Sequence, residues 1–201
     1  MAFINTIRPI EAEGNVRAMY ERQQAKYGYV PNYAKVFSHR PEIMHLWAKL
    51  LSGIRKSLDA RRFELVTVSA ALAVRSTYCS LAHGQALAEF YSADEIRAIV
   101  DESEAGPLTV AEKAMMRFAR KIARDATAVT AEDVEALKAH GFSDAEIFDI
   151  AAAATARTFF AQLCEGLGAF ADRPYGDTEP VLREVLTVGR SIDGAEPERL
   201  A

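Results

Sequence analysis

The residues best suited to chemistry lie in one short stretch, 76–83, which reads Ser-Thr-Tyr-Cys-Ser-Leu-Ala-His. Cys79 is one of two cysteines in the chain, and His83, one of four histidines, follows it four residues later. Positions i and i+4 of a helix share a face, so the thiol and the imidazole are expected to lie close together. A nearby imidazole makes a thiol more nucleophilic. The spacing therefore indicates a reactive cysteine.

The position of Cys79 supports the same interpretation. Ser76 is a suitable N-cap, which makes Cys79 the third residue of the following helix. The positive end of the helix dipole favours a thiolate there. A free cysteine more often serves as a small buried hydrophobe, and the helix start with His83 favours the reactive alternative for Cys79. Cys164 has no histidine nearby in sequence and is interpreted as a core residue.

An acidic residue precedes this stretch on a mostly apolar helix face. Glu64 has Val68 and Ala71 at positions i+4 and i+7. A carboxylate in apolar surroundings is costly unless it is paired. Two interpretations are open: an acid at an exposed helix start, stabilised by the dipole, or a buried acid that orients His83.

The elements that must position these residues are predicted to be helices. Apolar residues recur with helical spacing, no alternating strand pattern is found, and about eight helices are expected. Asp59 is a predicted N-cap for a helix over 61–74, and Ser76 for one that reaches about residue 90. Capping boxes are predicted at Ser92, Thr109, Thr130 and Ser143. A weak repeat relates residues 91–99 to 142–150 and suggests two related helical hairpins.

Length and composition exclude several classes of protein. The 201 residues are half hydrophobic and carry a net charge of −4, which fits a globular protein and argues against a nucleic-acid binder. No signal peptide or membrane span is predicted, so a cytoplasmic protein with reduced thiols is expected. No metal motif and no phosphate loop is found, and no cofactor is expected.

We predict one helical domain over 1–171 and a C-terminal extension or arm over 172–201. Its last dozen residues are expected to be mobile or to reach a neighbouring subunit.

Glu64, Ser76, Cys79 and His83 together resemble the motif of the carboxymuconolactone decarboxylase/alkylhydroperoxidase D superfamily. That motif is a Glu, a Cys-x-x-Cys beginning twelve residues later, and a His four residues after the second Cys. Ser76 stands at the first cysteine position. Residues 27–32, 111–119 and 141–147 resemble the peroxidase-related branch, and the resemblance extends from about Tyr27 to Asp172.

The resemblance implies an all-α, alkylhydroperoxidase D-like bundle that assembles as trimers or hexamers. It also implies thiol-dependent reduction of hydroperoxides, in which Cys79 is the nucleophile, His83 relays its proton and Glu64 holds His83. Tyr78 would be a nearby wall or donor. Because Ser76 cannot form the disulfide of a two-cysteine cycle, turnover would need an external thiol reductant, or Cys164 if the fold brings it near.

Two other functions remain open at this point. Glu64 and His83 could perform cofactor-free acid/base chemistry on a small organic acid or lactone, as in the decarboxylase branch. The chain could also be a non-catalytic oligomeric binding protein that keeps the pocket.

Overall fold

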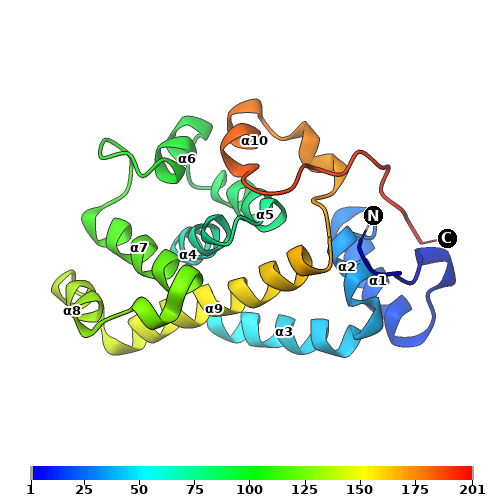
Figure 1. Ribbon diagram of the computed structural model, residues 1–201, viewed down its shortest axis with the longest axis horizontal. Coiled ribbons are helices and arrows are strands. Elements are labelled where there is room, and N and C mark those ends of the chain that lie inside the picture. The colour runs from blue at the N-terminus through cyan, green and yellow to red at the C-terminus, as the bar shows by residue number, and fades with distance from the viewer. Residues whose placement is uncertain (1, 201) are drawn as a thin grey trace.

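The computed structural model describes residues 2–200, and all regular secondary structure within them is helical (Figure 1). The predicted all-α class is confirmed, with ten α-helices in this range rather than about eight. They are α1 (Gly14–Tyr27), α2 (Asn32–Val36), α3 (Pro41–Ile54), α4 (Ala60–Ala73), α5 (Thr77–Leu87), α6 (Ala93–Val100), α7 (Val110–Asp125), α8 (Ala131–Ala139), α9 (Asp144–Gly166) and α10 (Pro180–Leu186). Short 3₁₀ segments cover Pro9–Glu11, Phe37–His39, Ala126–Ala128 and Arg173–Asp177.

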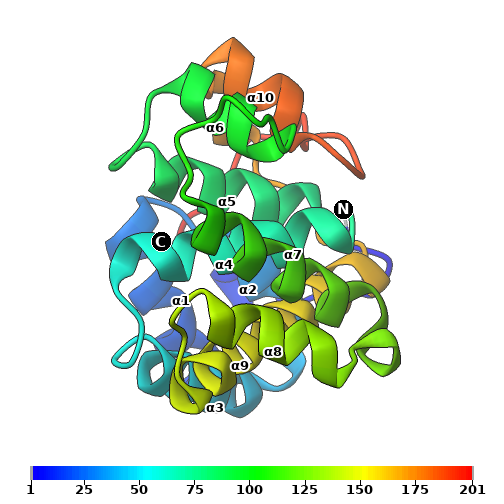
Figure 2. The same cartoon turned by 90° about the vertical axis from the view of Figure 1, so that its left-hand side faces the viewer.

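Helix α4 lies at the centre of the bundle and packs against α5, α7 and α9. Figures 1 and 2 show α3 beside α9 on one side of the bundle, and α6 beside α10 on the opposite side. By length and composition alone α9 could cross a membrane, but half of its apolar window is buried inside the fold. Its contacts with α3, α4 and α7 account for that apolar character.

Side-chain caps begin most of the helices that the sequence predicts. Asp59 accepts a hydrogen bond from the backbone N–H of Arg62 at the start of α4. Complete capping boxes form at Ser92, Thr109 and Ser143, at the starts of α6, α7 and α9, while at the start of α8 Asp133 accepts a hydrogen bond from the Thr130 backbone N–H. The two segments of the weak repeat begin with the same box, yet α6 has 8 residues and α9 has 23. Equivalent isoleucines are also buried in both, Ile96 and Ile99 in α6 and Ile147 and Ile150 in α9.

The turn between α4 and α5 sets the position of the predicted reactive stretch. Arg75 has a left-handed backbone (φ 56°), and Ser76 then caps α5. This helix ends at Leu87, earlier than predicted. Further along α5, a side chain on Gly84 would place its Cβ 2.2 Å from Leu186 of α10. The absence of a side chain at Gly84 thus allows α10 to pack closely on α5.

The C-terminal segment packs on helices of its own chain. Leu182 and Leu186 of α10 are buried in the same core as the other helices. The chain then returns to the N-terminal helices (Figure 1), where the backbone N–H of Val30 donates to the Glu198 carbonyl at 2.9 Å. Lys35 Nζ forms an ion pair with Glu198 at 2.9 Å. These contacts join residues far apart in sequence, which is why local sequence did not reveal them.

Candidate active site

A cavity of about 490 Å³ contains all three predicted catalytic side chains, Glu64, Cys79 and His83. Its size is in the range of small-molecule sites. Helices α3, α4, α5 and α9 contribute most of its walls, and Tyr175 adds a residue from the segment before α10. Tertiary packing therefore brings the residues of the sequence motif into one concave site.

Glu64 and His83 are in direct contact within this cavity. Glu64 lies on α4 with 5% of its surface exposed, and its Oε2 is 2.5 Å from His83 Nδ1 on α5. Its other oxygen, Oε1, is 3.5 Å from Arg55 Nη2. Thr67 Oγ1 lies 3.3 Å from the same imidazole nitrogen. Glu64 is thus a buried, paired acid rather than an acid at an exposed helix start.

The environment sets the charge of this pair. Burial alone would raise the pKa of Glu64, but its hydrogen bond to His83 and nearby positive charges lower that pKa below its usual value. Burial, assisted by the charge of Arg157, lowers the pKa of His83 to about 4. At neutral pH Glu64 is therefore ionised and His83 neutral. Because a carboxylate only accepts hydrogen bonds, Nδ1–H of His83 donates to Glu64 and Nε2 is left as a base.

Cys79 occupies the predicted helix start. Ser76 Oγ accepts a hydrogen bond from the Cys79 backbone N–H at 3.5 Å, and Cys79 is the third residue of α5. The thiol is buried but lines the cavity. Its sulfur accepts a hydrogen bond from Arg157 Nη1 at 3.8 Å. The guanidinium and the start of α5 therefore place positive charge beside this sulfur.

Arg157 is the residue of this site that sequence reasoning missed. It lies in the middle of α9, 4% exposed, with its guanidinium 5.3 Å from the ring centre of Trp47 and 5.5 Å from that of Phe160. A signal was present, because Arg157 is the only charged residue between Asp149 and Glu165. A single charge within a long uncharged helix segment indicates a special environment.

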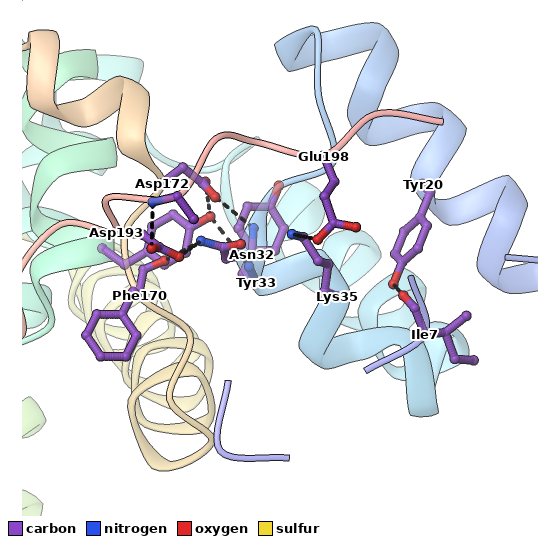
Figure 3. Close-up of polar contacts among 11 residues, drawn as sticks. Ile7, Tyr20, Asn32, Tyr33, Lys35, Phe170, Asp172, Asp193 and Glu198 are labelled. Atoms are coloured by element: carbon purple, nitrogen blue, oxygen red, sulfur yellow. Dashed lines mark hydrogen bonds and ion pairs between the residues drawn. The ribbon is translucent and has the colours of Figure 1, made fainter. Parts of the chain in front are cut away.

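Tyr78 forms a wall of the cavity, and its hydroxyl is directed to a buried polar cluster. It donates a hydrogen bond to Asp172 Oδ2, while Asp172 Oδ1 accepts one from the Asn32 backbone N–H at 2.8 Å. Figure 3 shows Asn32 next to both Asp172 and Asp193, where its side chain donates to Asp193 at 3.2 Å. Burial raises the pKa of Asp172 to about 6, despite these hydrogen bonds. Asp172 therefore fixes Tyr78 and joins the C-terminal segment to α2.

Cys164 lies in the core, fully buried. Burial holds the pKa of its thiol well above the usual value, which disfavours the reactive thiolate. Within residues 2–200 no three His, Cys, Asp or Glu side chains gather as a metal site would require. The groups available for chemistry in the cavity are therefore a thiol, an imidazole–carboxylate pair and a guanidinium.

Comparisons with known proteins agree with this fold. The crystal structure of the alkylhydroperoxidase AhpD core from Ralstonia eutropha JMP134, an uncharacterized peroxidase-related protein, aligns with a TM-score of 0.74 at 22% identity and covers 87% of this chain and 94% of that one. A peroxidase-related protein from Silicibacter sp. TM1040 gives 0.69 at 23% identity, over 85% and 93% of the two chains. The debrominase Bmp8 in complex with 2,3,4-tribromopyrrole gives 0.70 at 14% identity, over 92% and 98%.

The comparison with curated proteins gave no match. Residues 41–121 match the sequence model of the Carboxymuconolactone decarboxylase family, and this range contains Glu64, Ser76, Cys79 and His83. Over this range the chain is similar in sequence to that family, and over most of its length it shares the helical fold of the alkylhydroperoxidase D-like structures.

Proposed function

We propose that this protein is a thiol-dependent oxidoreductase that reduces hydroperoxides at Cys79. The observation that carries the proposal is the placement of this thiol at the start of α5, inside the cavity and 3.8 Å from the Arg157 guanidinium. A neutral imidazole held by an ionised carboxylate lines the same cavity. This combination supplies a nucleophile, a base and a positive charge within one site.

The first half of the reaction consumes the hydroperoxide. His83 takes the thiol proton through Nε2, and Glu64 stabilises the resulting imidazolium. The Cys79 thiolate attacks the terminal oxygen of the hydroperoxide, the O–O bond breaks, and the proton on His83 goes to the departing alkoxide. Cys79 becomes a sulfenic acid and an alcohol leaves, so two electrons pass from sulfur to the peroxide.

The second half needs an external thiol. Ser76 cannot form a disulfide, and Cys164 is fully buried with a raised pKa. One external thiol condenses with the sulfenic acid to give a mixed disulfide and water. A second thiol then attacks that disulfide, which restores Cys79 and releases the oxidised reductant. Such a cycle fits the reducing cytoplasm expected from the sequence.

Peroxide consumption with a thiol reductant tests the proposal. We expect turnover of cumene hydroperoxide with dithiothreitol, its loss in Cys79→Ser, and its retention in Cys164→Ser, which removes the other cysteine. Equal activity of the wild type and Cys79→Ser would overturn the proposal.

An acid/base reaction is the second candidate, because the family includes decarboxylases by name and Glu64 and His83 form a close pair. In that reaction Cys79 is dispensable while Glu64 and His83 are not. Turnover of a small organic acid or lactone that survives Cys79→Ser but not His83→Gln would select it.

We also propose that the chain forms a homo-oligomer, in line with the expected trimer or hexamer. Large apolar side chains are exposed on adjacent helices, Leu46 and Leu50 of α3 at 59% and 57%, and Phe148 and Phe159 of α9 at 72% and 47%. Exposed apolar residues grouped on one side mark an association surface. Because α3 also contributes Trp47 to the cavity, this surface lies near the candidate site.

A further inference from the structure

The guanidinium of Arg157 is a buried cation whose charge acts on Glu64 and His83, but it forms no ion pair with a carboxylate among residues 2–200. Only 4% of the residue is exposed. Nη1 contacts the Cys79 sulfur, and the buried Nε–H has no hydrogen-bond acceptor in the described part of the chain. Leaving a buried charge and a buried donor unpaired is costly, so such a group indicates a missing anionic partner.

The carboxylates nearest to the site are already engaged. Glu64 is bonded to His83 and lies near Arg55, while Asp172 accepts hydrogen bonds from Tyr78 and Asn32. The charged side chains that line the cavity are three cations, Lys26, Arg55 and Arg157, and two carboxylates, Glu64 and Glu89. With His83 neutral at neutral pH, the cavity has one positive charge in excess. This balance favours an anionic ligand over a neutral one.

The walls beside Arg157 are aromatic. Trp47 and Phe160 stack with ring centres 4.4 Å apart, and Tyr33 meets Phe160 at 5.3 Å. Tyr78 and Tyr175 add a further pair, with ring centres 5.9 Å apart. Aromatic faces pack well against planar rings, and a cavity of about 490 Å³ has room for one small molecule.

We propose that the cavity binds small planar organic carboxylates, aromatic or conjugated, whose carboxylate is held by the Arg157 guanidinium while the ring packs among the aromatic side chains. The bound molecule then lies beside Cys79, because Arg157 contacts both the carboxylate and the thiol. This inference deepens the proposed function by naming the class of molecule that Cys79 meets, and it rests on that function for its catalytic meaning. Binding itself needs no turnover.

Equilibrium binding of benzoate, measured by calorimetry at pH 7, tests the proposal. Benzamide has the same shape without the charge, and cyclohexanecarboxylate has the charge without the planar ring. We expect benzoate to bind at least about tenfold more tightly than either, as loss of a charge-assisted hydrogen bond or of ring packing would produce. Benzamide binding as tightly as benzoate overturns the anionic part of the proposal. Cyclohexanecarboxylate binding as tightly as benzoate overturns the planar part.

Variants locate the site. Arg157→Met should weaken benzoate binding about tenfold or more, and Arg157→Lys should weaken it less because the charge remains. Lys56→Met removes the same charge from an exposed residue that does not line the cavity, and it should change the affinity by less than about twofold because that charge is screened. Unchanged affinity in Arg157→Met overturns the proposal. If that variant does not fold, the comparison of benzoate with benzamide on the wild-type protein still decides.

Cys79→Ala separates this inference from the proposed function. Benzoate should bind to this variant as it does to the wild type, because the carboxylate is held by Arg157 and not by the thiol. In the wild-type protein, failure of peroxide turnover with benzoate binding intact would overturn only the peroxidase proposal. Turnover without benzoate binding would overturn only the carboxylate site.

Discussion

Glu64 Oε2 and His83 Nδ1 lie 2.5 Å apart, although the two residues come from different helices and are separated by nineteen positions. The contact makes the carboxylate an orienting group for the imidazole. It also explains why an acid is retained on an otherwise apolar face of α4, where it is 5% exposed.

Replacement of Glu64 by Gln should reduce activity more than stability. Gln keeps the shape and an acceptor oxygen but loses the charge that stabilises an imidazolium, so we expect peroxide turnover to fall about tenfold or more. Because one hydrogen bond remains possible, the free energy of unfolding should fall by about 1 kcal/mol or less. Peroxide assays and urea unfolding measure the two quantities. Unchanged turnover would remove Glu64 from the site.

His83 should make stability depend on pH. Its pKa falls from 6.5 to about 4 on folding, so between these values the unfolded chain binds more protons than the folded one. The His83 contribution is therefore present above pH 6.5 and is lost as the pH falls toward 4, by about 3 kcal/mol in total. Urea unfolding of the wild type and His83→Gln across this range measures it as the difference between the two proteins.

The pKa of Asp172 shifts on folding in the opposite direction to that of His83. An Asp172 variant is therefore a control for the pH dependence of unfolding. The Asp172 pKa rises from 3.8 to about 6 on folding, so its contribution to stability is present below pH 3.8 and is lost as the pH rises through 6. The two effects partly cancel in the wild type. The difference between wild type and Asp172→Asn should therefore slope with pH in the opposite sense to that for His83→Gln. Slopes of the same sign would contradict one of the two assignments, and the observed sign would show which one.

The two cysteines should react at different rates. Cys79 lines the cavity beside Arg157, whereas Cys164 is fully buried and its pKa is raised by that burial. We expect iodoacetamide at pH 7 to modify Cys79 first, with Cys164 modified only on unfolding. Mass spectrometry of the peptides gives the rate at each site. Equal rates in the folded protein would argue against an activated thiol.

Ser76→Cys should create an internal disulfide with Cys79 and raise peroxide turnover. The two positions are three residues apart at a helix start, the spacing of redox Cys-x-x-Cys pairs. A neighbouring thiol captures the sulfenic acid faster than an external one because its effective concentration is far higher. The loss of the Ser76 cap should cost about 1 kcal/mol. Mass spectrometry should show the loss of two hydrogens after peroxide treatment, and an unchanged mass would contradict the prediction.

The exposed apolar side chains of α3 and α9 should hold copies of the chain together. Light scattering at micromolar concentration should give a mass that is a multiple of 22.1 kDa. Leu46→Glu places a charge on this surface and should shift the protein toward the monomer, since an unpaired charge is costly at a buried interface. The matched change Val110→Glu alters another exposed apolar residue, on α7, and should leave the mass unchanged. A wild-type monomer would refute the homo-oligomer.

Local sequence was enough to predict where the two helices that carry the candidate site begin. Ser76 caps α5 and Asp59 caps α4 because a capping side chain binds backbone only a few residues away. The same locality places Cys79 and His83 one turn apart on one helix face. The all-helical class follows from apolar spacing, which records the face that each helix buries.

Tertiary structure alone decided which distant groups join this motif. Arg157 reaches Cys79 across 78 positions of sequence, and Asp172 reaches Tyr78 across 94. Near the C-terminus, Glu198 contacts Val30 and Lys35, in and just before α2 of the same chain. Such contacts depend on how α9 and the C-terminal segment pack against α3, α4 and α5. The packing of these helices is determined by the apolar surface that the whole core buries, so a local sequence pattern does not predict it.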